Sequence, residues 1–541
     1  MLGQMMQQPL LISSLLVHAE RHHGRQEIVS RRIEGDIHRY TFRDMAQRSR
    51  QTAQALDGLG LQHGDRVATL AWNGHRHLEL YFGVSGSGAV LHTVNPRLHE
   101  DQIVWIIENA EDDVLVFDLT FVDLVQSIAP RLTSVREFVV MTDRAHMPDV
   151  PDWRCYEDLL AQHDGDWTWP AFDELRASSL CYTSGTTGDP KGVLYSHRST
   201  VLHTFGVALP DSLGLSASDV VMPVVPMFHV NAWGMPYGAC MVGAKVVFPG
   251  ADLDGASLHE LIENEGVTLC AGVPTVWQGL LQHCAKAGSG LGSLLRAIVG
   301  GAACPPQMLR DLEETGVEVI HGWGMTETSP FGTASVLKKH QLDLPDGDRL
   351  HIKAKQGRCV FGIDLKITDD EGVELPWDGQ ISGHLMTRGH WVLDEYFGRN
   401  ESPLIDGWFP TGDIASIDPD GFMQITDRSK DVIKSGGEWI GSIDLENIAM
   451  EHPDVAEAAC IGIRHPKWDE RPLLVVVPRG GAAPSREELI AWYADKIAKW
   501  WTPDDVVFVD SLPLGTTGKV LKQALRDRFA RHFDTAPAAV V

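Results

Sequence analysis

The sequence predicts a multidomain protein of mixed α/β and α+β class. We expect a large N-terminal domain of βαβ sheets with a small β-barrel, followed by a small C-terminal α+β domain. Three observations support this. The chain has 541 residues, which is too long for one ordinary domain. Short β-branched runs alternate with helical patterns over its first two thirds, and the pattern changes after about residue 350 and again near Arg428–Lys430.

The first part of the chain alternates between helix and strand patterns. The N-terminal stretch MLGQMMQQPLLISSLLVHAERHH has a short apolar patch but lacks the basic region and cleavage site of a signal peptide. We therefore interpret it as an amphipathic first helix. Residues 43–60 have helical spacing and end in glycine, GDRVATLAWNG predicts a strand, and HLELYFGVSGSGAVLHTVNP predicts a helix and a second strand. The runs DVLVFDL, EFVVMTD, VVMPVVPMF, AKVVFPG and LRAIVGG predict further strands, and the alternation favours parallel sheets.

The last third predicts two smaller units. KQGRCVFGIDLKITDDEGVEL and DGQISGHLMTRG alternate with turn residues, which is typical of a small antiparallel β unit. Beyond DRSKDVIKSGGEW we expect strands at VAEAACIGI, PLLVVVP and DVVFVD and a helix at 486–499. We therefore divide the chain into an N-terminal domain, 1–428, and a C-terminal domain, 429–541, with a frayed tail DTAPAAVV.

Composition restricts the function. The chain has 46 basic and 73 acidic residues, a net charge of -27, so its surface repels nucleic acid and anionic membranes. An anionic substrate must then meet a local concentration of lysine, arginine or backbone N–H groups. The alternative is that the acidity is only a solubility or salt-adaptation trait, which we favour for the surface as a whole. The eight cysteines form no zinc or disulfide pattern and indicate reduced thiols in a cytoplasmic protein. No stretch approaches the ~20 apolar residues that span a bilayer.

The clearest local signal is YTSGTTGDPKGV at 182–193, which contains three glycines, several hydroxyls and one lysine. It follows an apolar segment, so we expect a loop at the end of a strand. Glycines let backbone N–H groups approach a phosphate, and serine and threonine hydroxyls add donors. The spacing differs from G-x-x-x-x-G-K-[ST], which indicates a phosphate-binding loop of another kind. The alternative is a flexible surface loop without a ligand.

The stretch GWGMTET at 322–328 is a weaker signal. Trp323 can lie against a base or an acyl chain, Thr326 can donate to a phosphate, and Glu327 can hold Mg²⁺. An acidic residue after a threonine is also typical of a helix N-terminus, so both interpretations stay open for this stretch alone.

Three further stretches are indecisive one by one. In WFPTGD at 408–413, Asp413 can accept from two adjacent ribose hydroxyls, but T-G-D is also a plain turn. KSGGEW at 434–439 lies just past the proposed domain boundary. TTGKVLK at 516–522 places Lys519 after a turn, where a lysine is usually only solvated.

Together and in this order, the five stretches resemble the adenylate-forming superfamily: acyl-CoA synthetases, firefly luciferases and the adenylation domains of peptide synthetases. The resemblance covers roughly residues 25 to 530. PMFHVNAWG, AGVPTVW, SGGEWI and HPKWDERP are similar to the fatty-acyl-CoA ligase branch, and within it to the 3-methylmercaptopropionate-CoA ligases of dimethylsulfoniopropionate breakdown. The chain departs from the family pattern at Trp323, usually tyrosine, and at Pro410, often arginine, where a charge near the ribose is lost.

The resemblance implies a two-step reaction of a carboxylic acid with ATP and CoA, with Mg²⁺ as cofactor. The carboxylate attacks the α-phosphate and pyrophosphate departs, and the CoA thiol then displaces AMP. No protein nucleophile is needed, so catalysis rests on positioning and charge stabilisation. The residues agree with this, because the five stretches offer glycines, hydroxyls, lysines and a glutamate but no Ser-His-Asp set.

The resemblance also implies residue roles. The β- and γ-phosphates of ATP are bound by Thr183, Ser184, Gly185, Thr186, Thr187, Gly188 and Lys191. The remaining nucleotide, acyl and CoA contacts fall on Gly301, Ala302, Ala303, Gly322, Trp323, Gly324, Met325, Asp413, Arg428, Lys434, Ser435, Gly436, Gly437, Glu438 and Trp439. The catalytic positions are Thr326 at the α-phosphate, Glu327 as Mg²⁺ ligand, Lys519 between carboxylate and α-phosphate, and His229. Lys430 is the hinge on which the C-terminal domain moves as a lid.

The acyl site is placed by the same resemblance. It implies substrate contacts at Val230, Asn231, Trp233 and Gly301, with the aromatic side chain as a gate. A buried tryptophan whose N–H has a partner is an equally good interpretation of Trp233. His229 can orient the substrate, although a lone histidine in an apolar run is more often a core residue.

We therefore expect an AMP-forming acid–CoA ligase for a short or medium acid, 3-methylmercaptopropionate in particular. A medium- or long-chain fatty-acyl-CoA synthetase is the alternative. An ATP-regulated binding protein without catalysis is a third interpretation, which the combination of Lys519, Glu327 and Lys434 disfavours. The resemblance implies a homodimer, and the composition implies a cytoplasmic protein that binds neither nucleic acid nor membrane.

Overall fold

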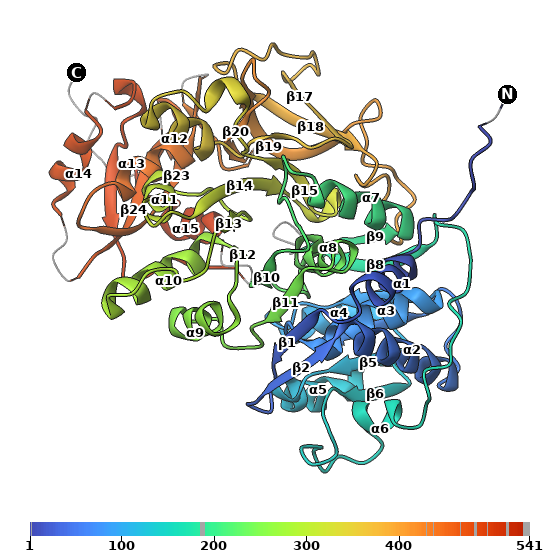
Figure 1. The fold of residues 1–541 in the computed structure, drawn as a ribbon. Coiled ribbons are helices and arrows are strands. Elements are labelled where there is room, and N and C mark those ends of the chain that lie inside the picture. The colour runs from blue at the N-terminus through green and yellow to red at the C-terminus, as the bar shows by residue number, and fades with distance from the viewer. Residues whose placement is uncertain are drawn as a thin grey trace.

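The computed structural model describes residues 1, 3–183, 190–428, 430–435, 438–465, 467–480, 484–494, 496–515 and 519–533. Two large sheets with their helices form most of the N-terminal domain, and a four-stranded antiparallel sheet adjoins them (Figure 1). A five-stranded sheet and the last helices form the C-terminal domain at the opposite side of the molecule from the N-terminus (Figure 1). The predicted fold class, a large and a small domain with mixed α/β sheets, is confirmed.

The first large sheet has seven strands and is parallel except for its last pair, β8 and β9. In sheet order the strands are β7 (Arg154–Cys155), β6 (Glu137–Val140), β5 (Val114–Phe117), β3 (Arg66–Leu70), β4 (Val90–Thr93), β8 (Ala177–Tyr182) and β9 (Gly192–Ser196). The central strands are buried along their length, as parallel strands between helices are. The accompanying helices are α1 (Ile12–His23), α2 (Phe42–Gly58), α3 (His75–Ser87), α4 (Glu100–Ala110), α5 (Val122–Ile128) and α6 (Tyr156–Leu160).

The second large sheet has nine strands, parallel in its middle and antiparallel at both ends. In sheet order they are β16 (Arg358–Cys359), β15 (Phe331–Ala334), β14 (Glu318–Gly324), β13 (Arg296–Val299), β12 (Leu269–Gly272), β10 (Val220–Pro223), β11 (Lys245–Phe248), β1 (Glu27–Arg31) and β2 (Ile37–Thr41). Its helices are α7 (His197–Ala208), α8 (Met235–Val242), α9 (Gly255–Glu265), α10 (Pro274–Ala287), α11 (Pro306–Glu314) and α12 (Asp346–Ala354).

Local sequence signals explain several of these elements. The predicted helix at 43–60 is α2, which begins with a reciprocal capping box between Thr41 and Asp44. Helix α3 ends at Gly88, whose φ of 94° is the left-handed conformation that glycine adopts most easily. The five short runs predicted as strands coincide with β5, β6, β10, β11 and β13.

The small unit after residue 350 is a four-stranded antiparallel sheet with the order β17-β18-β19-β20. Its strands are β17 (Ile363–Thr368), β18 (Gly383–Gly389), β19 (Phe409–Ile417) and β20 (Met423–Arg428). The antiparallel pattern is as predicted, but β17 and β20 are edges among the described strands, so the unit is an open sheet where we expected a small barrel. A bulge in β19 between Ile414 and Ala415 bends this sheet locally.

The C-terminal domain is the predicted compact α+β unit. Its strands are β21 (Ile433–Ser435), β22 (Glu438–Ile440), β23 (Val455–His465), β24 (Asp469–Pro478) and β25 (Asp505–Phe508), and its helices are α13 (Ser442–Met450), α14 (Arg486–Trp492) and α15 (Lys522–Phe529). The predicted helix at 486–499 is wrong in length, since α14 ends at Trp492. Trp492 Nε1 donates to the carbonyl of Ile448 and the Tyr493 hydroxyl donates to the carbonyl of Leu445, both on α13. These tertiary contacts outweigh the local helical propensity, and α14 ends there.

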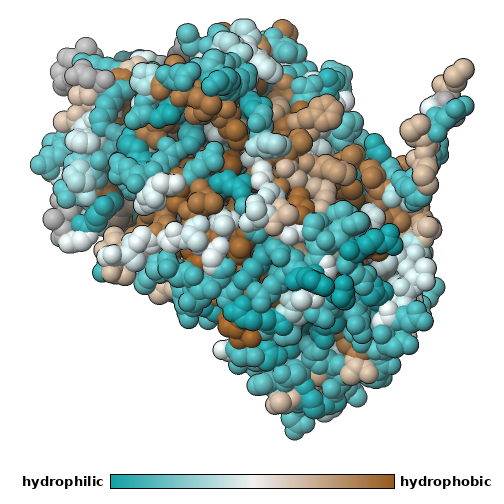
Figure 2. All heavy atoms as spheres, viewed as in Figure 1, coloured by the Kyte–Doolittle hydropathy of each residue, from teal (hydrophilic) through white to brown (hydrophobic). Residues whose placement is uncertain are grey.

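The proposed domain boundary falls between β20 and β21 and stays a prediction. The largest hydrophobic core lies where α1, α3 and α8 pack between the two large sheets, with Leu16, Tyr81 and Tyr237 almost fully buried. Figure 2 shows hydrophobic residues gathered over the region of β14, β15 and α7, whereas the lower part around α2 and β6 presents mainly hydrophilic residues.

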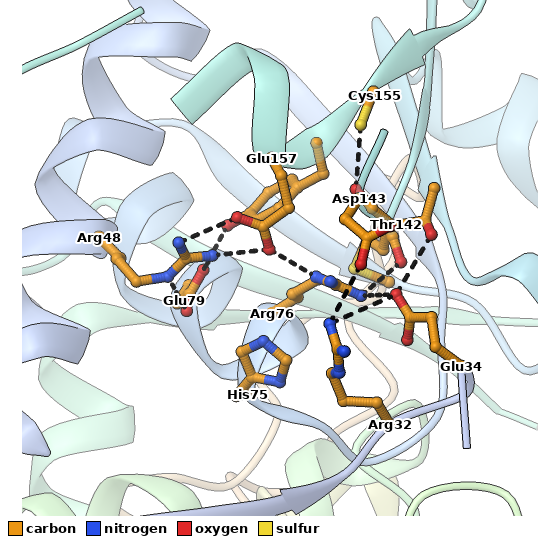
Figure 3. Close-up of polar contacts among 12 residues, drawn as sticks. Arg32, Glu34, Arg48, His75, Arg76, Glu79, Thr142, Asp143, Cys155 and Glu157 are labelled. Carbon is orange, nitrogen blue, oxygen red and sulfur yellow. Dashed lines mark hydrogen bonds and ion pairs between the residues drawn. The ribbon is translucent and has the colours of Figure 1, made fainter. Parts of the chain in front are cut away.

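A network of ion pairs fixes α2, α3 and α6 to the segment after β1 (Figure 3). Arg48 binds Glu79 and Glu157, and Arg76 binds Glu157 and Glu34. The Glu79 side chain is fully buried, and burial raises the pKa of its carboxyl while Arg48 opposes that rise. The network is structural, because each buried charge has a partner of opposite sign.

All eight cysteines are free thiols and seven are buried, as the scattered positions predict. In the part of the chain that the structure describes, no helix is both long enough and apolar enough to cross a membrane.

Candidate active site

The carboxyl ends of strands from both large sheets meet at one place, which is where parallel sheets usually bind ligands. Asn73, in the loop after β3, ties the two sheets together there. Its amide N–H₂ donates to the carbonyls of Pro223 and Val225, and its Oδ1 accepts from the N–H of Met227. The segment after β10, which continues to His229 and Trp233, is thereby held against the first sheet.

The phosphate loop begins at the end of β8 and returns into β9, as predicted for a loop after a strand. Its two ends are joined: the N–H of Thr183 donates to the carbonyl of Lys191, and the N–H of Lys191 donates to Thr183 Oγ1. Ser184, Gly185, Thr186, Thr187 and Gly188 lie outside the described residues. The Lys191 ammonium lies 4.9 Å from the ring centroid of Tyr396, and this cation–π contact positions the lysine charge near the Tyr396 ring.

Asp413 on β19 is the buried anion of the site, with 1% of its surface exposed. Its Oδ2 accepts from Trp323 Nε1 at 2.9 Å, and Arg428 Nε lies 2.8 Å from Oδ1. The Arg428 contact is an ion pair without hydrogen-bond geometry, so Oδ1 keeps acceptor capacity in a buried position. Burial raises the pKa of Asp413, and Arg428 and Trp323 oppose that rise. A free acceptor at this place fits a sugar hydroxyl.

Glu327 lies in a single helical turn, Thr326–Thr328, and is 7% exposed. Its Oε1 accepts the Tyr396 hydroxyl at 2.8 Å. Burial raises the pKa of the Glu327 carboxyl, while the Tyr396 hydrogen bond and the charge of Lys191 lower it. A buried carboxylate beside a phosphate-loop lysine, with one oxygen fixed by a tyrosine, fits a Mg²⁺ ligand. Thr326 is held by its carbonyl, which accepts the Tyr195 hydroxyl.

Lys519 brings the C-terminal domain to this cluster. The Lys519 side chain is exposed to water, yet desolvation by the surrounding protein and the nearby Arg428 lower the pKa of Lys519 from 10.5 to about 8, while Asp413 opposes the shift. His229 faces the same charge: burial and then Lys519 lower the pKa of His229 to about 4, so its ring is neutral at pH 7. Lys430, the proposed hinge, is exposed and also acts on Lys519.

The segment Val230–Gly234, hereafter the left-handed turn, lies next to His229. Its φ angles are 43°, 53°, 47° and 56° for four non-glycine residues and 75° for Gly234. A left-handed residue other than glycine costs roughly 1–2 kcal/mol, so this turn is strained. The half-buried Trp233 ring lies against Gly300, where a Cβ atom would be 3.0 Å from the ring, and near Gly301. Among the described residues, nothing accepts from its indole N–H.

The remaining predicted nucleotide positions follow β13 and β14. Gly301 and Ala302 are exposed, and Gly301 has a φ of 77°. Ala303 lines a cavity of about 670 Å³ between the two domains. Gly322 and Gly324 belong to β14, where a Cβ on Gly324 would be 1.9 Å from the Pro330 carbonyl, so only glycine fits. Met325 follows β14 directly, and the Trp323 ring packs on Gly332 of β15.

The described positions that were predicted to face CoA belong to β21 and β22 of the C-terminal domain. Lys434 on β21 is exposed, and its N–H donates to Glu470. Ser435 is buried and accepts from Arg471. Gly436 and Gly437 lie outside the described residues, and Glu438 and Trp439 belong to β22. Lys519 therefore lies within electrostatic range of Asp413, Arg428 and His229, whereas Lys434 makes no hydrogen bond or ion pair with these groups among the described residues.

Sequence reasoning missed the residues that hold the site. Tyr396 binds Glu327 and Lys191, Tyr195 binds the Thr326 carbonyl, and Tyr81 binds the left-handed turn. Each is separated from its partner by more than 65 positions. A single aromatic residue within a strand or helix pattern does not indicate which distant residue it will contact. The one available signal is that Tyr396 lies in the loop after β18, since loops after strands often carry ligand-site residues.

Comparison with known proteins agrees with this geometry. The family model described as AMP-binding enzyme matches residues 15–397, and the model described as AMP-binding enzyme C-terminal domain matches residues 444–519. The chain is 57% identical to a 3-methylmercaptopropionyl-CoA ligase of Ruegeria lacuscaerulensis, over 98% of this chain and 99% of that protein. It is 53% identical to a medium-chain-fatty-acid–CoA ligase of Ectopseudomonas oleovorans, over 98% of each chain.

A solved structure is similar over the whole chain. The anthranilate CoA ligase AuaEII in complex with anthranoyl-AMP superposes with a TM-score of 0.85 at 25% identity, covering 98% of this chain and 99% of that one.

Proposed function

The chain belongs to the family of AMP-binding enzymes, and from this premise we propose that it joins a short carboxylic acid to coenzyme A at the expense of ATP. The carboxylate oxygen attacks the α-phosphorus, the bond to the β-phosphate oxygen breaks, and pyrophosphate leaves. The CoA sulfur then attacks the acyl carbon of the adenylate, its proton is lost to solvent, and AMP leaves. The products are the acyl-CoA thioester, AMP and pyrophosphate.

One observation carries the proposal. Lys519 of the small domain lies with Asp413 and Arg428 of the large domain, beside the neutral ring of His229. A protein that only binds ATP has no need for a lysine delivered from a second domain. A lysine at the reacting carboxylate and α-phosphate offsets the charge that develops between two anions, which is the main requirement of the first step.

The other roles follow from the same geometry. Thr183 and Lys191 bind the phosphates that depart, and the free acceptor of Asp413 takes a ribose hydroxyl. Glu327 would hold Mg²⁺, which supplies charge neutralisation for the phosphates when it is bound. Tyr396 orients the Glu327 carboxylate and the Lys191 ammonium together. Trp323 holds Asp413 through its N–H, a second role beside a flat surface for the base.

The second step uses another face of the small domain. Lys434 and Ser435 lie on β21 and Glu438 lies on β22, and among the described residues the polar side-chain partners of this face are Glu470 and Arg471. We place CoA against this face after the domain turns about Lys430, a hinge motion of a common kind. The cavity of about 670 Å³ between the domains leaves a gap in their interface, which favours such a movement.

We place 3-methylmercaptopropionate first among the acids, because the relative at 57% identity is named for it. The Trp233 ring over Gly300 and Gly301 narrows the space beside the reaction centre, which suits a short acid. A medium-chain fatty acid is the alternative, supported by the relative at 53% identity.

We also propose a homodimer in the cytoplasm, where ATP and CoA are available and free thiols such as these eight persist. Phe205 and Leu209 are exposed one helical turn apart at α7, and Phe361 is 86% exposed. Gly206 and Gly362 both pack on the Trp391 ring, so Phe205 and Phe361 belong to neighbouring segments of the chain. A second copy would cover these exposed side chains. Light scattering on the wild type and on Phe361→Asp tests this, and a monomeric wild type contradicts it.

The test of the proposed function is CoA-dependent AMP and pyrophosphate formation across propionate, butyrate, 3-methylmercaptopropionate, hexanoate and palmitate. A pocket built for long chains gains ~0.8 kcal/mol for each methylene it accepts, about fourfold in kcat/KM. We expect the highest kcat/KM for a short acid. A maximum at palmitate would contradict the proposed substrate, and ATP hydrolysis to ADP or no turnover would contradict the ligase itself.

A further inference from the structure

The left-handed turn, Val230–Gly234, needs an explanation because left-handed residues other than glycine normally occur singly. Val230 is also β-branched, and for such a residue this conformation is a genuine outlier. Outliers of this kind persist only where surrounding contacts over-determine them, and they cluster at ligand sites. The contacts that impose the turn are therefore candidates for a functional role.

The side chain of Asn231 is the centre of those contacts. It is 3% exposed and points into the first sheet. Its Oδ1 accepts from the Tyr81 hydroxyl at 3.2 Å, and its Nδ2 donates to Ser179 Oγ at 3.1 Å. Cys181 Sγ donates weakly to the same Oδ1 at 3.6 Å. Asparagine also tolerates the left-handed conformation better than most residues, so the residue type suits both tasks.

The same tyrosine fixes the chain on the near side of the turn. The Tyr81 hydroxyl lies 2.5 Å from the carbonyl of Met227, and Tyr81 is fully buried in α3. On the far side, Gly234 packs so closely on His203 that a Cβ atom would lie 2.6 Å from the ring. The turn is thus fixed at its start by α3, in its middle by β8 and at its end by α7.

The turn leaves one side chain outside the core. Val230, Asn231 and Ala232 are buried, whereas Trp233 is only half-buried and lies against Gly300 and near Gly301. In a right-handed conformation of the same residues, the Trp233 side chain would leave the turn in another direction, because the direction of Cα–Cβ follows the backbone angles. The buried contacts of Asn231 therefore determine where this indole lies.

We propose that Asn231, held by Tyr81 and Ser179, is a positioning residue that sets the acyl-chain length of the enzyme. It locks the left-handed turn so that the Trp233 ring closes the space over Gly300 and Gly301. The inference rests on the proposed function, because it takes Trp233 to border the path of the acid. Loss of the Asn231 hydrogen bonds lets the Trp233 ring move away, so that longer acids can bind. Short acids then lose the contact with the Trp233 ring that orients them.

The experiment measures kcat/KM for 3-methylmercaptopropionate, hexanoate and decanoate in wild type, Asn231→Ala and Tyr81→Phe. We expect the ratio of decanoate to 3-methylmercaptopropionate to rise by about tenfold or more in both variants. The change should appear in KM for the acid, with KM for ATP within about twofold of wild type. Asn231→Gly accepts the backbone angles without the amide, so it should shift the ratio in the same way with a higher Tm than Asn231→Ala.

Tyr156→Phe is the matched control. Tyr156 is also a buried tyrosine that binds α3, through Glu79, but within the described part of the chain it makes no hydrogen bond to the turn. It should lower Tm and leave the chain-length ratio unchanged. If Asn231→Ala does not fold, the chain-length ratio of Tyr81→Phe alone tests the proposal.

The outcomes separate the two levels of inference. If Trp233→Ala shifts the ratio but Asn231→Ala and Tyr81→Phe do not, the lock is refuted and the acyl path stands. If Trp233→Ala leaves the ratio unchanged in an active enzyme, both the acyl path and the lock are refuted. If the wild type forms no thioester with any acid, the proposed function itself fails.

Discussion

The pH dependence of the first step tests whether Lys519 acts where the structure puts it. Desolvation and Arg428 lower the pKa of Lys519 to about 8, from an ordinary value of 10.5. A lysine with a lowered pKa is charged below that pKa and loses its charge as the pH rises through it. The charged fraction is then about 0.9 at pH 7, about 0.5 at pH 8 and about 0.1 at pH 9.

Adenylate formation should fall in proportion, by about tenfold between pH 7 and pH 9. An unperturbed lysine would keep the rate flat over this range. The assay is initial pyrophosphate release at subsaturating ATP and constant ionic strength, because kcat/KM reports the free enzyme. The thioester step, started from chemically made acyl-adenylate, should rise over the same range, since a thiol titrates at about 8.5.

Lys519→Arg is the control, because its guanidinium stays charged to pH 10. We expect it to be slower but to lose the decline above pH 8. A wild-type rate that stays flat to pH 10, or the same decline in Lys519→Arg, would show that another group titrates and would refute the assignment. Lys519→Ala should lower adenylation by about 10²-fold or more and leave the thioester step from preformed adenylate largely intact.

Three further outcomes are expected. Glu327→Gln should impair adenylation in a way that higher Mg²⁺ eases, whereas a purely helical role predicts a lower Tm with a near-normal rate. Tyr396→Phe removes a hydrogen bond to a carboxylate, worth about 1.5–3 kcal/mol, and should raise the Mg²⁺ concentration for half-maximal rate, with no change in acid preference. Arg48→Met leaves Glu79 as an unpaired buried charge and should cost about 3–5 kcal/mol in urea unfolding, and a second change, Glu79→Leu, should recover most of this loss; a loss that persists in the double variant contradicts the pairing.

The sequence predicted the parts of the site that are local in the chain. The phosphate loop follows from one short stretch whose residue types are tied to phosphate chemistry, whereas the roles of Thr326, Glu327 and Lys519 were predicted only from the resemblance of the five stretches, taken together, to adenylate-forming enzymes. The strands could also be predicted from short stretches, because a β-branched run between turn residues is a local pattern. Helix α14 was predicted too long because its end is set by Trp492 and Tyr493 packing on α13, which no local pattern records.

The contacts that hold the site could not be predicted. Tyr396 reaches Glu327 across 69 positions, and Tyr81 reaches Asn231 across 150. The left-handed turn was also beyond prediction, because backbone preference argues against that conformation at Val230. Tertiary contacts offset the conformational free-energy cost of this turn, and only the folded structure shows those contacts.

The charge distribution connects the two domains to the nucleotide. The chain carries a net charge of -27, yet Lys191, Arg428 and Lys519 gather around Asp413 and Glu327. Two of these cations belong to the large domain, and the third arrives only with the small one. Under the proposed hinge motion, a polyanion such as ATP meets all three of these cations only in this orientation. By linkage, ATP must favour this orientation by the same free energy with which the orientation strengthens ATP binding. Release of pyrophosphate removes much of that negative charge, so under the same proposal the first step weakens the attraction between the nucleotide and Lys519 before CoA attacks.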